Sequence, residues 1–126
     1  MKRIVNTDKA PGAIGPYSQG VAAGPFYFFS GQIPLDPKTG EMVGDDAASQ
    51  AERVLENVKA LLESEGMDFS NVIKTTVFIT DMANFGAVNQ VYSRYFTDQY
   101  PARSCVAVAA LPKGALVEIE VVAYKG

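Results

Sequence analysis

Arg103 is the side chain in this sequence whose chemistry is easiest to predict. It lies in the segment Pro101-Ala102-Arg103-Ser104-Cys105, in a chain of 126 residues that contains no histidine. Histidine is the commonest general base and metal ligand, so any reaction here must use other groups. A guanidinium is always charged and presents a planar set of donors that fits a carboxylate or phosphate. The sequence therefore predicts a site for an anionic small molecule.

Two other kinds of side chain could work beside this arginine. If residues 103 to 105 are extended, Arg103 and Cys105 project to the same face of a strand. Glu118 and Glu120 share one face of a later segment, so a carboxylate could approach the arginine if the two strands are close. Spacing alone favours a plainer interpretation, in which the charges form a surface ion pair of little energetic value and the cysteine is a small buried hydrophobe.

Composition limits the class of protein. Hydrophobic residues make up 48% of the chain and charged residues 20%, which is typical of one globular domain, here residues 1–126. Eleven basic against 14 acidic residues give a net charge of -3 without a basic block, so we expect neither nucleic-acid nor membrane-surface binding. No apolar run approaches the roughly 20 residues that span a bilayer, and no signal peptide is visible.

The single cysteine, Cys105, excludes an intrachain disulfide and a thiolate zinc cage. This usage favours a reducing compartment, and we expect a cytoplasmic protein. Phosphate-binding glycine motifs and the HExxH zinc motif are absent, so the sequence predicts no cofactor and no metal.

The elements that must position these residues can be read from periodicity and turn signals. Asp45 or Asp46 can cap a helix that runs to about Glu65, and a second helix follows Asp81 or Asn84 and ends before Tyr100. A loop rich in glycine and proline covers residues 7–20. We expect strands at residues 20–23, 25–30, 72–80, 104–111 and 116–124, with surface turns at 36–40 and 112–114. This order predicts an α+β domain with two helices packed on one face of a mixed sheet.

The segment from Cys105 to Leu111 is apolar at every position rather than alternating. A continuous apolar run is typical of a strand that is covered on both faces. Two helices cover only one face of a small sheet, so we expect another copy of the chain to cover the second face. The alternative is a small sheet whose alanine side chains are left partly exposed.

Short segments spread along the chain resemble one known family. They are Ile14-Gly15-Pro16-Tyr17-Ser18-Gln19-Gly20, Phe29-Ser30-Gly31-Gln32-Ile33-Pro34, Asn57-Val58, Lys74-Thr75-Thr76-Val77-Phe78, Asn89-Gln90-Val91-Tyr92, Pro101-Ala102-Arg103-Ser104-Cys105-Val106 and Val117-Glu118-Ile119-Glu120. Together they resemble the Rid family of reactive intermediate deaminases, also called the YjgF or translation-inhibitor-like family. The resemblance covers residues 5 to 124.

The resemblance implies a chorismate-mutase-like α+β fold assembled as a homotrimer, with clefts between subunits. It also implies hydrolysis of 2-imino acids, such as 2-iminobutanoate and 2-iminopropanoate, and of their enamine tautomers to 2-keto acids and ammonia. By the same resemblance, Arg103 would bind the substrate carboxylate and Glu118 would hold the catalytic water. The cleft would further be lined by Tyr17, Ser30, Gly31, Asn89 and Cys105.

Three other functions stay open at this point. The chain could bind 2-keto acids as a trimeric sensor without turnover. It could be an endoribonuclease-type translation inhibitor, although its acidic balance and lack of histidine weigh against RNA cleavage. It could also be a redox-controlled holdase that depends on Cys105.

Overall fold

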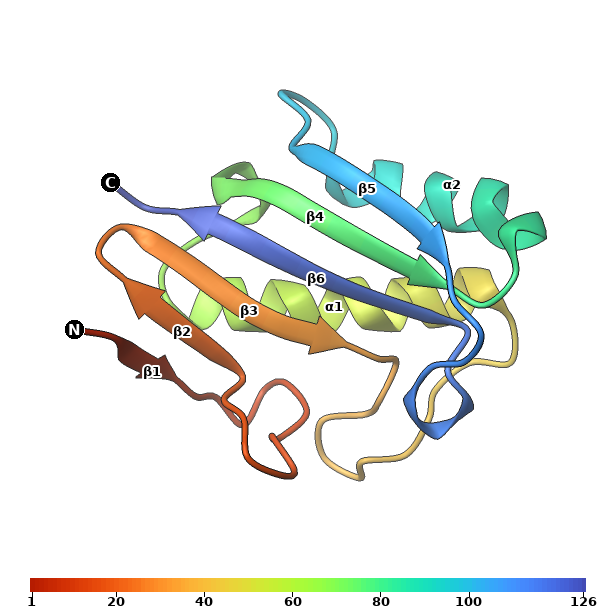
Figure 1. Ribbon diagram of the computed structural model, residues 1–126, viewed down its shortest axis with the longest axis horizontal. Coiled ribbons are helices and arrows are strands. Elements are labelled where there is room, and N and C mark those ends of the chain that lie inside the picture. The colour runs from red at the N-terminus through yellow and green to blue at the C-terminus, as the bar shows by residue number, and fades with distance from the viewer.

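The computed structural model describes all residues from 1 to 126. One mixed sheet of six strands carries two helices on one face, so Figure 1 shows a two-layer α+β domain. The strands lie in the order β1-β2-β3-β6-β4-β5. Only β4 and β5 run parallel, and the other neighbours are antiparallel. The expected α+β class, with two helices on one face of a mixed sheet, is confirmed, and the homotrimer stays a prediction.

The elements agree closely with the predicted segments. The strands are β1 Arg3–Val5, β2 Gly20–Ala23, β3 Phe26–Gln32, β4 Val72–Ile79, β5 Ala102–Ala107 and β6 Val117–Tyr124. The helices are α1 Ala47–Ser64 and α2 Phe85–Tyr95, with short 3-10 turns at Phe69–Asn71, Met82–Asn84 and Pro112–Gly114. Neither helix has the length and apolar character that crossing a membrane would require.

Helix α1 begins where a local hydrogen-bond pattern satisfies its free backbone donors. The Asp46 carboxylate accepts from the Ser49 backbone N–H at 2.8 Å, and Ser49 Oγ accepts in return from the Asp46 N–H. This capping box selects Asp46 rather than Asp45 as the first residue outside the helix. The buried side of α1, which includes Val54, Leu55 and Leu61, then packs under the sheet.

The sheet face beneath the helices is the core of the domain. Alternate residues of β6, from Val117 to Ala123, are buried there, and Thr75, Val77 and Ile79 of β4 lie on the same side. The residues between them in β6, Glu118 and Glu120, point to the open face, as the sequence predicts. This alternation fixes which face each candidate site residue occupies.

Two predictions need correction. The strand expected at 104–111 is only Ala102–Ala107, because the pairing with β4 ends at Ala107 and the chain then turns toward Pro112. The sequence interpretation also missed β1, because three residues are too few to show a period. Strand β5 is the edge of the sheet and is largely exposed in the single chain. Its coverage by another subunit stays a prediction.

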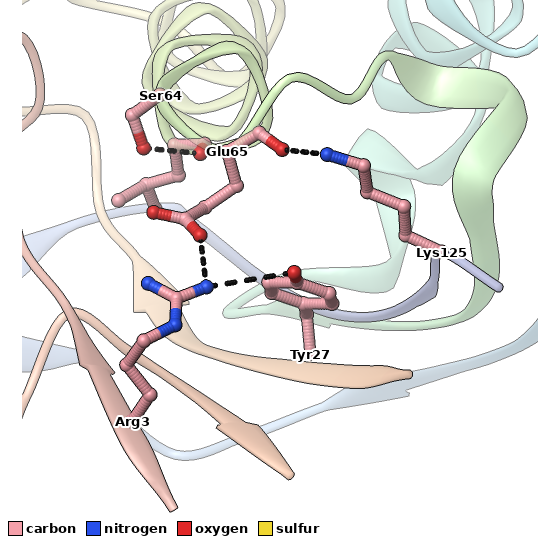
Figure 2. Close-up of polar contacts among 6 residues, drawn as sticks. Arg3, Tyr27, Ser64, Glu65 and Lys125 are labelled. Atoms are coloured by element: carbon pink, nitrogen blue, oxygen red, sulfur yellow. Dashed lines mark hydrogen bonds and ion pairs between the residues drawn. The ribbon is translucent and has the colours of Figure 1, made fainter. Parts of the chain in front are cut away.

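Both ends of the chain are fastened to the end of α1, as Figure 2 shows. Arg3 of β1 forms an ion pair with the Glu65 carboxylate and also donates a hydrogen bond to the Tyr27 hydroxyl. Lys125, just after β6, donates from Nζ to the Glu65 backbone carbonyl at 2.8 Å. A cation on the last carbonyls of a helix satisfies free acceptors and complements the helix dipole. These contacts hold the two terminal strands against the helix layer.

Candidate functional site

Arg103 lies on β5 and turns toward helix α2. In the parallel ladder it is paired with Thr75, which is buried on the helix face, so the two side chains share that face. The guanidinium donates from Nη1 to Asn89 Oδ1 at 2.7 Å. Its carbon lies 4.8 Å from the centre of the Tyr92 ring and 5.5 Å from that of Phe85. The cationic group is therefore held by one amide and two aromatic rings.

The three holding residues come from one side of α2. Positions 85, 89 and 92 are four and three residues apart, so they lie above one another on the helix surface. Arg103 forms no ion pair with any carboxylate in the chain. A fixed guanidinium without an internal counter-ion is suited to binding an external carboxylate.

Cys105 follows two residues later on the same face, paired with Val77. The prediction that Arg103 and Cys105 project together is confirmed. Burial raises the pKa of the Cys105 thiol, and the positive charge of Arg103 opposes that rise. A raised pKa means little thiolate at neutral pH, which agrees with a packing role for this side chain.

Glu118 belongs to a different part of the molecule. It is half-buried on β6, where its pairing partner Phe78 lies on the face away from the helices. Burial, with a smaller contribution from the charge of Glu120, raises the pKa of the Glu118 carboxyl. A carboxyl group with a raised pKa that lines a cavity is a candidate acid or base.

The Glu118 carboxylate packs directly against the backbone of Gly31. A side-chain carbon added at Gly31 would collide with the carboxylate, so the glycine leaves the space that the acid occupies. Ser30 is fixed next to it, because Ser30 Oγ donates to the Ser18 carbonyl at 2.6 Å. Glycine at this position therefore accommodates the approach of Glu118 and does not serve a positive backbone angle.

These residues line a cavity of about 510 Å³. Its wall includes Ile14, Tyr17, Ser30, Gly31, Lys113 and Glu118. Lys113 lies in the turn between β5 and β6 and has a left-handed backbone conformation, with φ at 58°. Tyr17 is about half exposed. The cavity thus combines apolar and polar walls with one carboxylate and one lysine, a mixture typical of a small-molecule site.

Buried amide side chains hold the loops around this cavity. Gln19 accepts from the Thr7 N–H at 2.7 Å and donates to the Thr7 and Pro11 carbonyls, which ties down the loop before Tyr17. Asn57 of α1 donates to the carbonyls of Ile33 and Leu35, at 3.3 and 3.0 Å. Each side-chain amide supplies hydrogen bonds to loop backbone groups that have no partner in a helix or strand.

Arg103 and Glu118 do not meet within one chain. Strand β4 lies between their strands, and their pairing partners on β4, Thr75 and Phe78, point to opposite faces. The expectation that the glutamate approaches the arginine across neighbouring strands is therefore wrong for a single chain. The reason is the two-residue period of the ladder, which places the two side chains on different faces.

Arg103 instead opens onto a second cavity of about 470 Å³, which also touches Asn89, Tyr92 and Tyr100. The structure therefore divides the predicted site residues into two groups. Asn89, Arg103 and Cys105 lie at the β5 edge, and Tyr17, Ser30, Gly31 and Glu118 lie at the cavity between the 7–20 loop and β6. No cluster of three or more potential metal ligands is present.

The contact between Tyr92 and Arg103 was not predicted from the sequence. Tyr92 is 6% exposed and belongs to the core, and its ring also faces the guanidinium. The helical spacing of Phe85, Asn89 and Tyr92 was the available signal. This spacing alone could not identify Arg103 as the contact, because the β4–β5 register that places Arg103 beside that side of the helix is a tertiary property.

Comparison with known proteins gives consistent matches over the whole chain. The family model described as Endoribonuclease L-PSP matches residues 7–125. The chain is 47% identical to the human protein named 2-iminobutanoate/2-iminopropanoate deaminase, over 100% of this chain and 92% of the human protein. Both the match over the domain and the level of identity establish common ancestry.

Solved structures agree. The Rid family protein YyfA from Yersinia pestis is 47% identical with a TM-score of 0.95, covering 98% of this chain and 99% of that one. Escherichia coli TdcF, solved with bound serine, is 49% identical with a TM-score of 0.93 at the same coverage. The fold, the ordered motifs and these matches agree, and the chain belongs to the Rid family.

Proposed function

We propose that this protein hydrolyses reactive 2-imino acids, and their enamine tautomers, to 2-keto acids and ammonia. The observation that carries the proposal is Arg103, a guanidinium fixed by Asn89 and two rings without an internal counter-ion. The name of the human relative supports this choice of substrate. Two small members of the class, 2-iminobutanoate and 2-iminopropanoate, are the substrates to test first.

Arg103 would bind the substrate carboxylate. A planar guanidinium can make two parallel hydrogen bonds to a carboxylate, which fixes both its position and its orientation. Holding a small substrate in this way brings its imine carbon to a defined place and reduces the entropy cost of the reaction. The carboxylate is common to all 2-imino acids, so this contact selects the class rather than one member.

The two halves of the site would come together between subunits. Arg103 and Glu118 face opposite sides of the sheet, so only a second copy can bring a cavity with Glu118 to the arginine of the first. The open sheet face also carries large apolar side chains, and about half of Ile4, Phe28 and Tyr124 is exposed in the single chain. Exposed apolar surface on this scale favours association. We propose a homotrimer with three such sites.

Glu118 would act on the water. Its carboxylate accepts a proton as the water oxygen attacks the imine carbon, while the electrons of the C=N bond move to nitrogen, which takes up a proton from solvent. Glu118 then returns its proton to the nitrogen of the 2-amino-2-hydroxy acid, the C–N bond breaks to release ammonia, and the hydroxyl proton passes to solvent as the carbonyl forms. The raised pKa of Glu118 suits this exchange, because it brings the carboxyl closer to neutral pH.

The mechanism needs neither histidine nor a cofactor. Free imines hydrolyse in water unaided, so the barrier to be removed is modest beside the 8 to 23 kcal/mol that enzymes commonly supply. Positioning of the substrate by Arg103 and of the water by Glu118 can lower the activation barrier by the amount that is needed. The sequence, which offers arginine, glutamate and tyrosine in place of histidine, fits these requirements.

The direct test generates 2-iminobutanoate with a threonine dehydratase and measures whether this protein accelerates release of the keto acid and ammonia. Wild type should accelerate the release, and Arg103→Ala should lose at least tenfold of the effect. Arg94→Ala is the matched control, because Arg94 also lies on the protein surface but pairs with Glu52 on α1. Binding of 2-ketobutyrate without acceleration would instead identify a sensor and refute the enzymatic proposal.

A further inference from the structure

The Tyr92 ring that faces the Arg103 guanidinium is itself fixed by contacts on its other sides. Tyr92 is 6% exposed, and its ring stacks on Phe96 with 4.4 Å between ring centres. Its hydroxyl is hydrogen-bonded to Thr75 Oγ1 at 2.9 Å. The ring therefore cannot turn without breaking a buried hydrogen bond and an aromatic contact.

Thr75 contacts both of the other residues, Arg103 through strand pairing and Tyr92 through its hydroxyl. It is completely buried on β4 and is the residue paired with Arg103 across the β4–β5 ladder. The backbone register thus links Arg103 to Thr75, the hydroxyl bond links Thr75 to Tyr92, and the ring links Tyr92 back to the guanidinium.

We propose that Tyr92, held in place by Thr75, is a positioning residue that sets the orientation of the Arg103 guanidinium for carboxylate binding. The consequence for turnover rests on the proposed deaminase function, whereas the orientation itself does not. A long exposed arginine loses rotamer entropy when it binds a ligand, and a platform that orders it beforehand reduces that cost. A guanidinium stacked on a ring also keeps its edge free to donate hydrogen bonds.

The chemistry of Tyr92 supports this role over packing alone. A leucine would fill the core at this position without presenting a π face to the cation. Burial raises the pKa of the Tyr92 hydroxyl, so the group stays neutral and keeps its bond to Thr75 over the physiological range. Asn89 fixes one end of the guanidinium from the same helix, and the ring fixes its plane.

The kinetic test compares Tyr92→Leu, Tyr92→Phe and Tyr95→Leu. Loss of the ring should raise KM for the imino acid, and Kd for 2-ketobutyrate, about three- to thirtyfold with a smaller change in kcat. Tyr92→Phe keeps the ring and should stay within about threefold of wild type. Tyr95→Leu is the matched control, since Tyr95 lies on the same helix but bonds to Glu56 rather than contacting Arg103. It should leave KM unchanged.

Partial unfolding gives a different result. It lowers the fraction of active protein, so apparent kcat falls while KM stays constant. A KM effect confined to Tyr92→Leu supports positioning. A kcat loss at constant KM, or equal KM effects in Tyr92→Leu and Tyr95→Leu, would overturn it.

An NMR measurement tests the orientation independently of any enzymatic activity. In wild type, the Arg103 side-chain N–H resonances should be shifted upfield by the Tyr92 ring. Tyr92→Leu should remove the shift, whereas Tyr92→Phe and Thr75→Val, which both keep the ring but lose its hydrogen bond, should each weaken the shift. An unchanged Arg103 resonance in Tyr92→Leu would refute the proposal even if the protein is a deaminase. Failure of wild type to hydrolyse imines, with these shifts observed, would refute the proposed function alone.

Discussion

Arg103 and Glu118 lie on opposite faces of the same sheet, separated by strand β4. Thr75 and Phe78, their partners on that strand, are three residues apart, so the alternation of the strand puts them on different sides. No rotation of either side chain can bring the two groups together within one chain. If both act in one reaction, each site takes its arginine from one subunit and its glutamate from another.

Complementation between subunits is the sharpest test of this arrangement. Arg103→Ala and Glu118→Gln should each assemble into inactive oligomers. Refolding an equal mixture of the two should restore activity, because about a quarter of the interfaces then combine an intact arginine half with an intact glutamate half. Activity is measured as keto-acid release, and mixing of subunits is verified by native mass spectrometry. Mixed oligomers without recovered activity would contradict a shared site.

Gly31→Ala should slow turnover strongly while the protein stays folded. The added methyl group would collide with the Glu118 carboxylate and displace it from the cavity. We expect at least a tenfold loss of kcat, measured in the dehydratase-coupled assay beside a circular dichroism melt. Gly86→Ala is the matched control, because nothing lies within 4 Å of an added carbon there and no positive φ is recorded. Full activity of Gly31→Ala would show that the position of Glu118 is not critical.

The sequence predicted the helices and most strands because their signals are local. The apolar positions of α1 repeat at helical spacing, and the β-branched run of β4 has the composition of a central strand. The faces of Arg103 and Glu118 depend on which strands are neighbours, which is a long-range property. Each strand's own alternation could be read, and Glu118 and Glu120 were placed correctly opposite the core. That β4 lies between β6 and β5 could not be derived from either segment.

The residues around the cavity illustrate the same limit. Gln19 and Asn57 look like ordinary polar side chains in sequence, yet both are buried and bind loop carbonyls far away in the chain. Glycine at position 31 is explained only by a carboxylate from a strand 87 positions later. The family resemblance included these positions, but their physical reasons came from the tertiary structure.

Removal of the cap of α1 should weaken the fold without changing the site. Asp46→Ala loses the acceptor for the Ser49 N–H and should lower the free energy of unfolding by about 0.5–2 kcal/mol, measured by urea denaturation. Asp45→Ala is the matched control, because the neighbouring aspartate makes no capping bond. Similar losses in both variants would mean that charge, rather than the capping box, stabilises this helix end.

Glu118 should make the protein less stable as the pH rises, and the sign follows from its environment. Burial and the charge of Glu120 raise the pKa of its carboxyl in the folded state above the value in the unfolded chain. Between these two pKa values the folded state binds more protons than the unfolded state, so the free energy of unfolding falls with increasing pH. Above both values the unfavourable contribution is complete, and below both it is absent. Glu118→Gln removes the charge and should therefore raise Tm at pH 7 while leaving Tm nearly unchanged below about pH 4.

The same shift predicts the pH dependence of turnover. If ionised Glu118 accepts the proton of the attacking water, kcat should rise with pH through a pKa above the ordinary value of 4.5 for glutamate. Glu120→Gln should move this midpoint downward, because the neighbouring charge opposes ionisation of Glu118. The measurement is the pH profile of keto-acid release for wild type and Glu120→Gln, corrected for uncatalysed imine hydrolysis at each pH. A profile that is flat across the acidic range would exclude a base role for Glu118, and an unchanged midpoint in Glu120→Gln would exclude electrostatic coupling between the two glutamates.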